Sequence, residues 1–276
     1  FLGAFCLAQK SEAAILYVDQ LPAEAGSGWD GIDGHAYVGA PGTGTGYSTI
    51  QAAMDAMTQG STIYMRGGTY NEHQIYMCAS RHGLPDNKNK LTSYPGEWAK
   101  IDGQHLYDPA RIRNAVLYCT GGAGFSNWIF ERFEVTGGGD VDELGNPLRS
   151  EAGGFYINDN VEGLEFRYLY VHDNYSDTAS SGKAGGISLD HARKCTIEYC
   201  YLKGNGNPVG QRNSANAQIA ITADYAYANP TSLASAMHSN MVRYNLIDGE
   251  SSDVLGGSSI GFVHKGMQRL TGYDYG

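Results

Sequence analysis

Polar side chains gather where a short apolar strand recurs along the second half of the chain. The strand is VLYC at 116–119, FYIN at 155–158, ISLD at 187–190, IAIT at 219–222 and IGFV at 260–263. If the repeats stack, the last residue of each strand and the two residues after it form three rows. The polar members of these rows include Asn158, Asp159, Asn160, Asp190, His191, Asp224, His264 and Lys265. Carboxylates, amides, imidazoles and one lysine are therefore expected along one edge, over about 15 Å.

These residue types suit the removal of a proton from a carbon atom beside a carboxylate. The carboxylate must first be neutralised by a divalent cation or a cationic side chain. Calcium binds several oxygen ligands in flexible geometry, and we expect them from Asp159, Asp190 and Asp224. Lys265 is the one lysine of the three rows. A lysine that is desolvated or lies beside calcium can act as the base.

Residues around these rows complete the candidate site. Arg193 can hold a substrate carboxylate through two hydrogen bonds. His191 or His264 can protonate a leaving oxygen near neutral pH. Tyr156 offers an aromatic ring on which a sugar can stack.

A structural interpretation competes with each of these assignments. Asn158 and Asn160 are candidate substrate ligands, but asparagines at strand ends more often form turns and stack into ladders. A turn needs neither an imidazole nor an ammonium group, so the two interpretations are evenly balanced at 190–191 and 264–265.

The elements that must position these residues follow from a repeat. The apolar strands are spaced by 39, 32, 32 and 41 residues, and a second segment follows each of the first four: WIFERFEVTG, LEFRYLYVHD, CTIEYCYLKG and NMVRYNLIDG. In 164–173 the apolar residues stand at even positions before Arg167–Tyr168 and at odd positions after it. A bend is therefore predicted there, because side chains alternate along a strand. Each repeat thus predicts three short strands, one coil of a solenoid.

Stacking the coils predicts which side chains face inward. The expected inward pairs of the first strand are Val116/Tyr118, Phe155/Ile157, Ile187/Leu189, Ile219/Ile221 and Ile260/Phe262. In the second segment, Cys195 and Cys200 also fall inward, as small hydrophobic residues. An outward row of alternating charge is formed by Glu131, Arg167, Glu198 and Arg243, and it supports the alignment independently.

A short amphipathic helix is predicted within 47–60, before the coils. Ser48 and Gln51 have the spacing of a capping box, and Gly60 stands where a left-handed C-cap is expected. The apolar stripe consists of Ile50, Ala53, Met54 and Met57. We expect this helix to close the N-terminal end of the solenoid.

The order of these segments resembles a known superfamily. The helix, GSTIYMRGGTY (60–70), LTSYPGEWAKIDG (91–103) and the irregular coils are similar to the pectate-lyase-like right-handed parallel β-helix proteins. The segment 94–103 is similar to early coils of alginate- and dermatan-cleaving (chondroitinase B-like) lyases. The resemblance implies an all-β right-handed parallel β-helix over 14–276. We expect these residues to form a single domain that is incomplete at its C-terminus. It also implies a polysaccharide lyase that cleaves a uronic-acid polymer by β-elimination, with a Lys or Arg base, matched here by Lys265.

The amino-acid composition and net charge restrict which classes of molecule the protein can bind. The chain has 38 glycines, 20 tyrosines and 17% charged residues, which is typical of an all-β protein with many turns. A net charge of −10 argues against nucleic acid, which needs a basic face. It would also repel an acidic polysaccharide unless a local cation such as calcium offset it. The chain has no apolar run long enough for a membrane span.

The first residues of the sequence bear on the cellular location of the protein. Residues 1–13 contain a short apolar core and the small-x-small pattern Ser11-Glu12-Ala13, which is typical of the tail of a secretory signal peptide. We therefore expect a secreted or cell-surface protein, with an ordinary N-terminal segment as the alternative.

Two other functions fit the same fold. A glycoside hydrolase needs two carboxylates at a defined separation, and Asp159 and Asp190 on neighbouring coils are too close for an inverting pair. A non-catalytic glycan-binding or surface-structural β-helix, such as an adhesin or fibre segment, would suit the glycine-rich segments at 121–124, 137–139 and 182–186.

Overall fold

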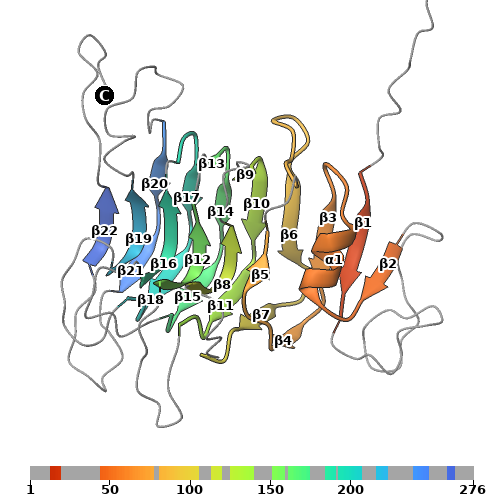
Figure 1. Cartoon of the computed structure of the whole chain (residues 1–276), viewed down its shortest axis with the longest axis horizontal. Coiled ribbons are helices and arrows are strands. Elements are labelled where there is room, and N and C mark those ends of the chain that lie inside the picture. The colour runs from red at the N-terminus through yellow and green to blue at the C-terminus, as the bar shows by residue number, and fades with distance from the viewer. Residues whose placement is uncertain are drawn as a thin grey trace, which may run out of the picture.

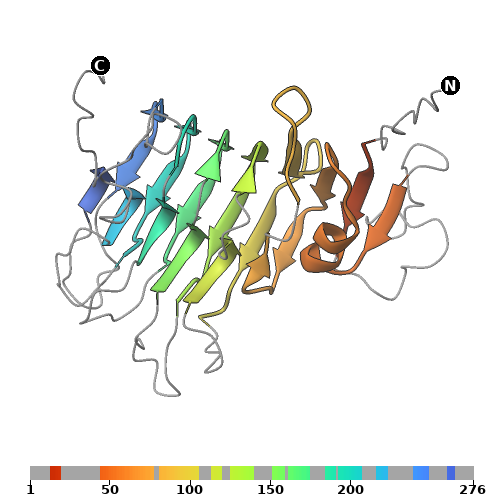
Figure 2. The same cartoon turned by 45° about the horizontal axis from the view of Figure 1, so that its top comes forward.

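In the computed structural model, the chain winds into a stack of coils whose strands form three long parallel sheets (Figure 1). The structure describes residues 13–19, 44–77, 81–105, 113–119, 125–139, 151–158, 161–174, 184–190, 192–206, 216–222, 239–248 and 260–264. Neighbouring strands of each sheet come from successive coils, as Figure 2 also shows. The predicted all-β right-handed parallel β-helix is confirmed.

Each sheet collects one strand from each coil. The first sheet contains, in spatial order, β2 (Gly44–Tyr47), β1 (Ile15–Val18), β3 (Thr62–Met65), β6 (Asn89–Ser93), β10 (Trp128–Glu131), β14 (Glu165–Arg167), β17 (Thr196–Glu198) and β20 (Met241–Arg243). The second contains β4 (Gly68–Tyr70), β7 (Ala99–Asp102), β11 (Phe133–Thr136), β15 (Tyr170–His172), β18 (Tyr201–Lys203) and β21 (Leu246–Asp248). The third contains β5 (Ile75–Tyr76), β8 (Arg113–Cys119), β12 (Glu151–Ile157), β16 (Ala184–Asp190), β19 (Asn216–Thr222) and β22 (Ile260–His264). A two-stranded sheet pairs β9 (Phe125–Ser126) with β13 (Val161–Glu162).

The interior is filled by ladders of apolar side chains. Phe130 and Phe166 stack across β10 and β14 with ring centroids 5.2 Å apart, and Phe155 meets Phe166 edge-on at the same distance. These arrangements add to the free energy gained by burying the rings. Cys195 and Cys200 are free and buried, as predicted, and burial raises the pKa of both thiols to about 12.

The predicted bend and charge row are both present. Tyr168 lies between β14 and β15 with a φ of 52°. In the first sheet, the Glu198 carboxylate forms an ion pair with Arg167, whose Nε lies 3.1 Å away, and accepts a hydrogen bond from Arg243 Nε at 2.8 Å. The alternation of charge therefore joins three neighbouring coils.

The third sheet corrects two predicted registers. Leu117, not Val116, pairs with Phe155, so Leu117 and Cys119 occupy the inward positions and Tyr118 points outward. At the other end, Phe262 pairs with Ile219 and His264 with Ile221, a shift of two residues. The four-residue apolar segments used for the alignment lie only at the C-terminal ends of longer strands, namely β8, β12, β16 and β19. These segments alone could therefore not fix the register.

The N-terminal helix is α1 (Ile50–Ala56), and its caps differ from the prediction. Thr49, not Ser48, is the N-cap, and its hydroxyl accepts from Ala52 N at 3.1 Å. The Glu72 carboxylate also accepts from Ile50 N at 2.7 Å. The helix ends at Ala56 with Met57 as an extended C-cap, and Gly60 lies in the following turn with a φ of 83°.

The helix lies at the N-terminal end of the stack, where it packs against β1, β2, β3 and β5 (Figure 1). Ile50, Ala53 and Met54 are completely buried, and Met57 is partly buried, so the predicted apolar stripe faces the core. No helix among the described residues is long and apolar enough to cross a membrane.

Candidate functional site

The predicted polar row lies at the ends of the third-sheet strands. Asn158 follows β12, Asp190 ends β16 and Thr222 ends β19. The pairs Ile157–Leu189 and Asp190–Thr222 place these residues at successive positions across the sheet. Asp190 is only 3% exposed, and Asn158 is half-buried. The main chain is fixed here, since Asn158 N donates to Cys119 O at 2.8 Å.

A column of outward side chains leads along the same face. It begins with Tyr76, Tyr118 and Tyr156 and continues with Ser188 and Ala220. The rings of Tyr76 and Tyr118 lie 5.1 Å apart at a tilt of 45°. Tyr156 is only 2% exposed, so a sugar can stack on its ring only after the groups covering it move. Its role as a stacking platform remains a prediction.

Among the described residues of this face, two buried polar atoms have no hydrogen-bond partner. They are Asn158 Oδ1 and Ser188 Oγ. Asn158 uses its amide nitrogen instead, which donates to the Tyr156 hydroxyl at a long 3.5 Å. Most buried polar atoms in proteins are hydrogen-bonded, so an exception in a native structure requires an explanation. These two atoms give the third-sheet face hydrogen-bonding capacity that the protein itself does not use.

Arg193 lies beside this face but is already paired. Its Nε and Nη2 lie 3.0 and 2.9 Å from Glu162 Oε2. Lys194 Nζ is 2.7 Å from the other carboxylate oxygen of Glu162. Hydrogen bonds from Lys194 and then Arg193 outweigh burial and hold the pKa of Glu162 below its usual value. A substrate carboxylate would have to compete with Glu162 for the Arg193 guanidinium.

The remaining predicted residues are not brought together by the described part of the chain. Asp159, Asn160, His191, Asp224 and Lys265 lie outside the described residues. His264 is described only by its backbone, which lies within β22 opposite Ile221 and not beyond the strand end as predicted.

The calcium prediction is therefore not supported by a formed site. Among the described ranges, no group of three or more His, Cys, Asp or Glu side chains could hold a metal ion. Of the three expected ligands, only Asp190 falls in these ranges. The described residues alone do not fit calcium, and its binding remains a prediction.

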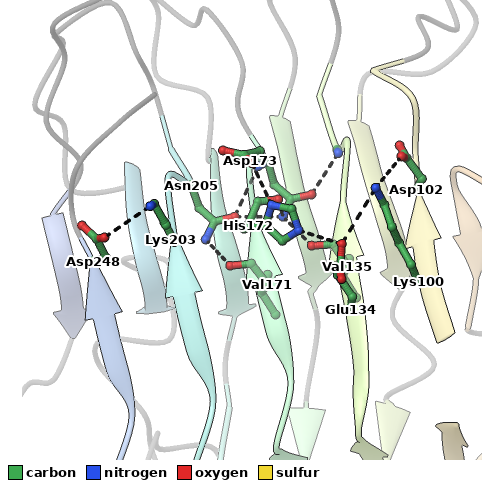
Figure 3. Close-up of polar contacts among 12 residues, drawn as sticks. Lys100, Asp102, Glu134, Val135, Val171, His172, Asp173, Lys203, Asn205 and Asp248 are labelled. Carbon is green, nitrogen blue, oxygen red and sulfur yellow. Dashed lines mark hydrogen bonds and ion pairs between the residues drawn. The ribbon is translucent and has the colours of Figure 1, made fainter. Parts of the chain in front are cut away.

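A second polar cluster, which the sequence did not single out, lies on the outer face of the second sheet (Figure 3). His172 Nε2 lies 2.9 Å from Glu134 Oε1, and His172 Nδ1 lies 2.7 Å from Asp173 Oδ2. Lys100 Nζ is 3.2 Å from Asp102 and 3.8 Å from Glu134. Aligning the outward positions of the second repeated segment could have found this cluster.

The two carboxylates set the protonation of His172. Burial alone lowers the pKa of this imidazole, but hydrogen bonds to Asp173 and Glu134 outweigh burial and raise the pKa above its ordinary value. The hydrogen bond from His172 likewise holds the pKa of Asp173 below its ordinary value. The Tyr170 ring stacks on the imidazole at 4.0 Å between centroids. The cluster is thus an ion-paired clamp between neighbouring coils.

A buried amide ladder supports the same edge of the second sheet. Asn174 Nδ2 donates to Asn205 Oδ1 at 2.8 Å, and Asn205 Nδ2 donates to Gln218 Oε1 at 2.6 Å. Asn174 Oδ1 accepts from Gly138 N at 2.9 Å. A Cβ atom at Gly138 would lie 2.2 Å from Gly153 O, so only glycine permits this approach. The ladder is structural, because its amides are used by the protein.

The chain has similarity to known lyases, over a short segment of sequence and in the arrangement of its strands. No family model matches the chain. A segment of 58 residues, 21% of the chain, is 41% identical to the pectate lyase PEL9 of Emericella nidulans and covers 14% of that protein. The structure of a rhamnogalacturonan lyase matches 95% of the chain with a TM-score of 0.56 and 17% identity. A pectate lyase Pel9A matches 87% of the chain with a TM-score of 0.34 and 13% identity.

These proteins are longer than the region that they share with the chain. The chain spans 64% of the rhamnogalacturonan lyase and less of the fungal pectate lyase. The shared architecture nevertheless extends over nearly all of the chain. The chain is thus a parallel β-helix protein that shares its fold with this rhamnogalacturonan lyase structure.

Proposed function

We propose that the protein is a polysaccharide lyase that acts on a uronic-acid polymer at the outer face of its third sheet. The observation that carries the proposal is the pair of buried atoms without partners, Asn158 Oδ1 and Ser188 Oγ, beside Asp190. A sugar presents hydroxyl groups and a carboxylate that can supply the missing hydrogen bonds once the groups that cover these buried atoms move, as for Tyr156. The similarity to pectate and rhamnogalacturonan lyases supports this class of substrate.

The proposed reaction is β-elimination. Lys265 takes the proton from C5 of a uronate, the C5–H electron pair forms the C4=C5 double bond, and the C4–O glycosidic bond breaks. The leaving oxygen accepts a proton from His191 or His264, and Arg193 orients the uronate carboxylate. Calcium, when bound, would neutralise that carboxylate and so acidify the C5 proton. Within the proposal, Asp159, Asp190 and Asp224 supply its ligands.

Export of the protein belongs to the same proposal. Cys119 is disulfide-bonded, and disulfides persist mainly in oxidising compartments. Together with the signal-like residues 1–13, this supports a secreted or cell-surface location, where an acidic polysaccharide is available.

Absorbance near 235 nm tests the activity, because the C4=C5 double bond of the product absorbs there. The full chain is incubated with polygalacturonate, rhamnogalacturonan, alginate and glycosaminoglycans, with calcium and with a chelator. We expect product from one of these polymers, loss of activity in Lys265→Ala, and full activity in the matched control Lys90→Ala. Lys90 lies on the first sheet, where it pairs with Glu131 at 3.0 Å.

Two outcomes would contradict the proposal. Product formation that Lys265→Ala leaves unchanged would remove the assigned base. The absence of product from every polymer, with binding of one of them retained, would favour a non-catalytic glycan-binding β-helix.

A further inference from the structure

Three tyrosines form an exposed row at the corner between the first and second sheets. Tyr168, Tyr199 and Tyr244 occupy the bends after β14, β17 and β20. Their rings stack at 5.2 and 5.1 Å, with interplanar angles of 10° and 18°. They remain 51%, 46% and 66% exposed. We call these three residues the corner row.

The backbone of the corner row is unusual for such large side chains. The φ angles are 52°, 55° and 56°, in the left-handed region that bulky residues rarely adopt. Glycine or asparagine would occupy these bends at lower conformational cost. The exposed rings recover little free energy from burial. Arg132 has the same bend in the preceding coil with a φ of 58°, so the fold sets this conformation, and the next three coils differ by placing an exposed aromatic ring at the bend.

The stacking determines which atoms of the corner row a ligand would meet. Each ring covers the face of its neighbour, so the ring edges and phenol hydroxyls remain accessible. A tyrosine hydroxyl both donates and accepts hydrogen bonds. The row therefore presents hydroxyl groups with a repeat of about one coil spacing. A second stack, Tyr170 on Tyr201 at 5.0 Å, runs parallel to it on the second sheet.

The charges beside the corner row favour an anionic ligand. A chain of ion pairs joins Lys88 to Glu165 at 2.6 Å, Glu165 to Arg167 at 2.7 Å, and then Arg167 and Arg243 to Glu198. The side chains of Arg167 and Arg243 are 35% and 46% exposed, whereas that of Glu198 between them is 8% exposed, so positive charge faces solvent beside the row. The Arg243 guanidinium lies 5.3 Å from the centre of the Tyr244 ring, at the end of the row.

We propose that the corner row is a second binding site, separate from the third-sheet face, for an extended acidic polysaccharide. A linear polymer with one hydroxyl-rich unit per step matches a row with one hydroxyl per coil. Carboxylates of the polymer would meet the arginines beside the row. The site would hold the chain on a polymer while the third-sheet face acts. The anchoring role rests on the proposed function, but the binding itself does not.

Native electrophoresis in gels that contain polygalacturonate tests this binding directly. The variant Tyr168→Phe/Tyr199→Phe/Tyr244→Phe keeps the stacked rings and removes only the hydroxyls. We expect its apparent dissociation constant to rise by about fivefold or more, as for the loss of several hydrogen bonds. The matched control is Tyr17→Phe/Tyr64→Phe/Tyr94→Phe, which alters a tyrosine cluster near the N-terminal end of the first sheet. Its mobility should equal that of the unmodified protein.

The outcomes separate this proposal from the lyase proposal. Retardation that depends on the corner row supports the site even if no 235 nm product forms. Equal retardation of the corner variant and the unmodified protein would overturn the site even if product forms. A corner variant that binds normally but changes oligomeric state in sedimentation would also overturn it, because the row would then contact a second copy.

Discussion

The outer faces of the second and third sheets differ in how their polar groups are used. On the second sheet, His172 lies between two carboxylates, and Asn174 belongs to a closed ladder of amides. On the third sheet, Asn158 Oδ1 and Ser188 Oγ are buried without partners. The ion-paired face is richer in the residues usually linked with catalysis. The third-sheet face is nevertheless the better candidate, because two neighbouring described side chains there have buried oxygens whose hydrogen bonds a ligand could complete.

Asp190→Asn should reveal the largest difference in activity between the third-sheet and second-sheet faces. It keeps the shape of a buried side chain on the third-sheet face and removes its charge. We expect a fall in kcat/KM of at least about 100-fold, measured from initial rates at 235 nm. Glu134→Gln, the matched change on the second sheet, should stay within a few-fold of the unmodified protein. Equal losses in both variants would abolish the distinction.

Two asparagines, one at each face, should differ in how much they contribute to the free energy of unfolding. Asn174→Ala removes several buried hydrogen bonds and leaves Gly138 N without its acceptor. We expect the free energy of unfolding to fall by about 3 kcal/mol in urea denaturation. Asn158→Ala removes an oxygen that has no partner, so it should cost less than about 1 kcal/mol but lower activity. The reverse order of stabilities would show that the ladder is not the structural element.

The His172 clamp predicts a pH dependence of stability. Because the pKa of His172 is raised in the folded state, its contribution is complete below the ordinary value of about 6.5. The contribution is lost as pH rises through the folded-state pKa. We expect His172→Gln to be destabilised by about 1 kcal/mol at pH 6 and by less at pH 8.5, in urea denaturation at both values. A pH-independent difference between the two proteins would contradict the clamp.

Ser188→Ala should have the smallest effect on stability and the opposite sign. The Ser188 hydroxyl is buried without a partner, so its removal should be neutral or stabilising by up to about 1 kcal/mol. Activity should fall at the same time. Thermal unfolding measures the first effect and the 235 nm rate the second. A clear loss of stability would mean that the hydroxyl has a structural partner.

Periodicity predicted the fold because each coil repeats the same physical demands. The stacked rings of Phe130 and Phe166 and the charge row through Glu198 follow from the alternation of inward and outward side chains, which recurs in every coil. The register failed at Val116 and at His264, where strands extend past the apolar residues used for the alignment. Besides the cap at Thr49, the first turn of α1 is capped by Glu72, which is distant in sequence and which no local pattern predicts.

The site was predicted less completely than the fold. The row from Asn158 to Asp190 follows from strand ends, so the sequence placed it well. The pairing of Arg193 with Glu162 was not predicted, since it joins β13 to the segment after β16 on the next coil. The clamp around His172 was not predicted because Glu134 lies opposite Tyr170 in the register, so its contact with His172 runs diagonally between the two strands.

The most direct test of the difference between the two faces is a crystal structure of the Lys265→Ala protein with an oligosaccharide of the polymer that yields 235 nm product. The account predicts a sugar hydroxyl or carboxylate within hydrogen-bonding distance of Asn158 Oδ1 or Ser188 Oγ. An oligosaccharide seated beside His172 on the second sheet, with both third-sheet atoms still unpaired, would contradict it.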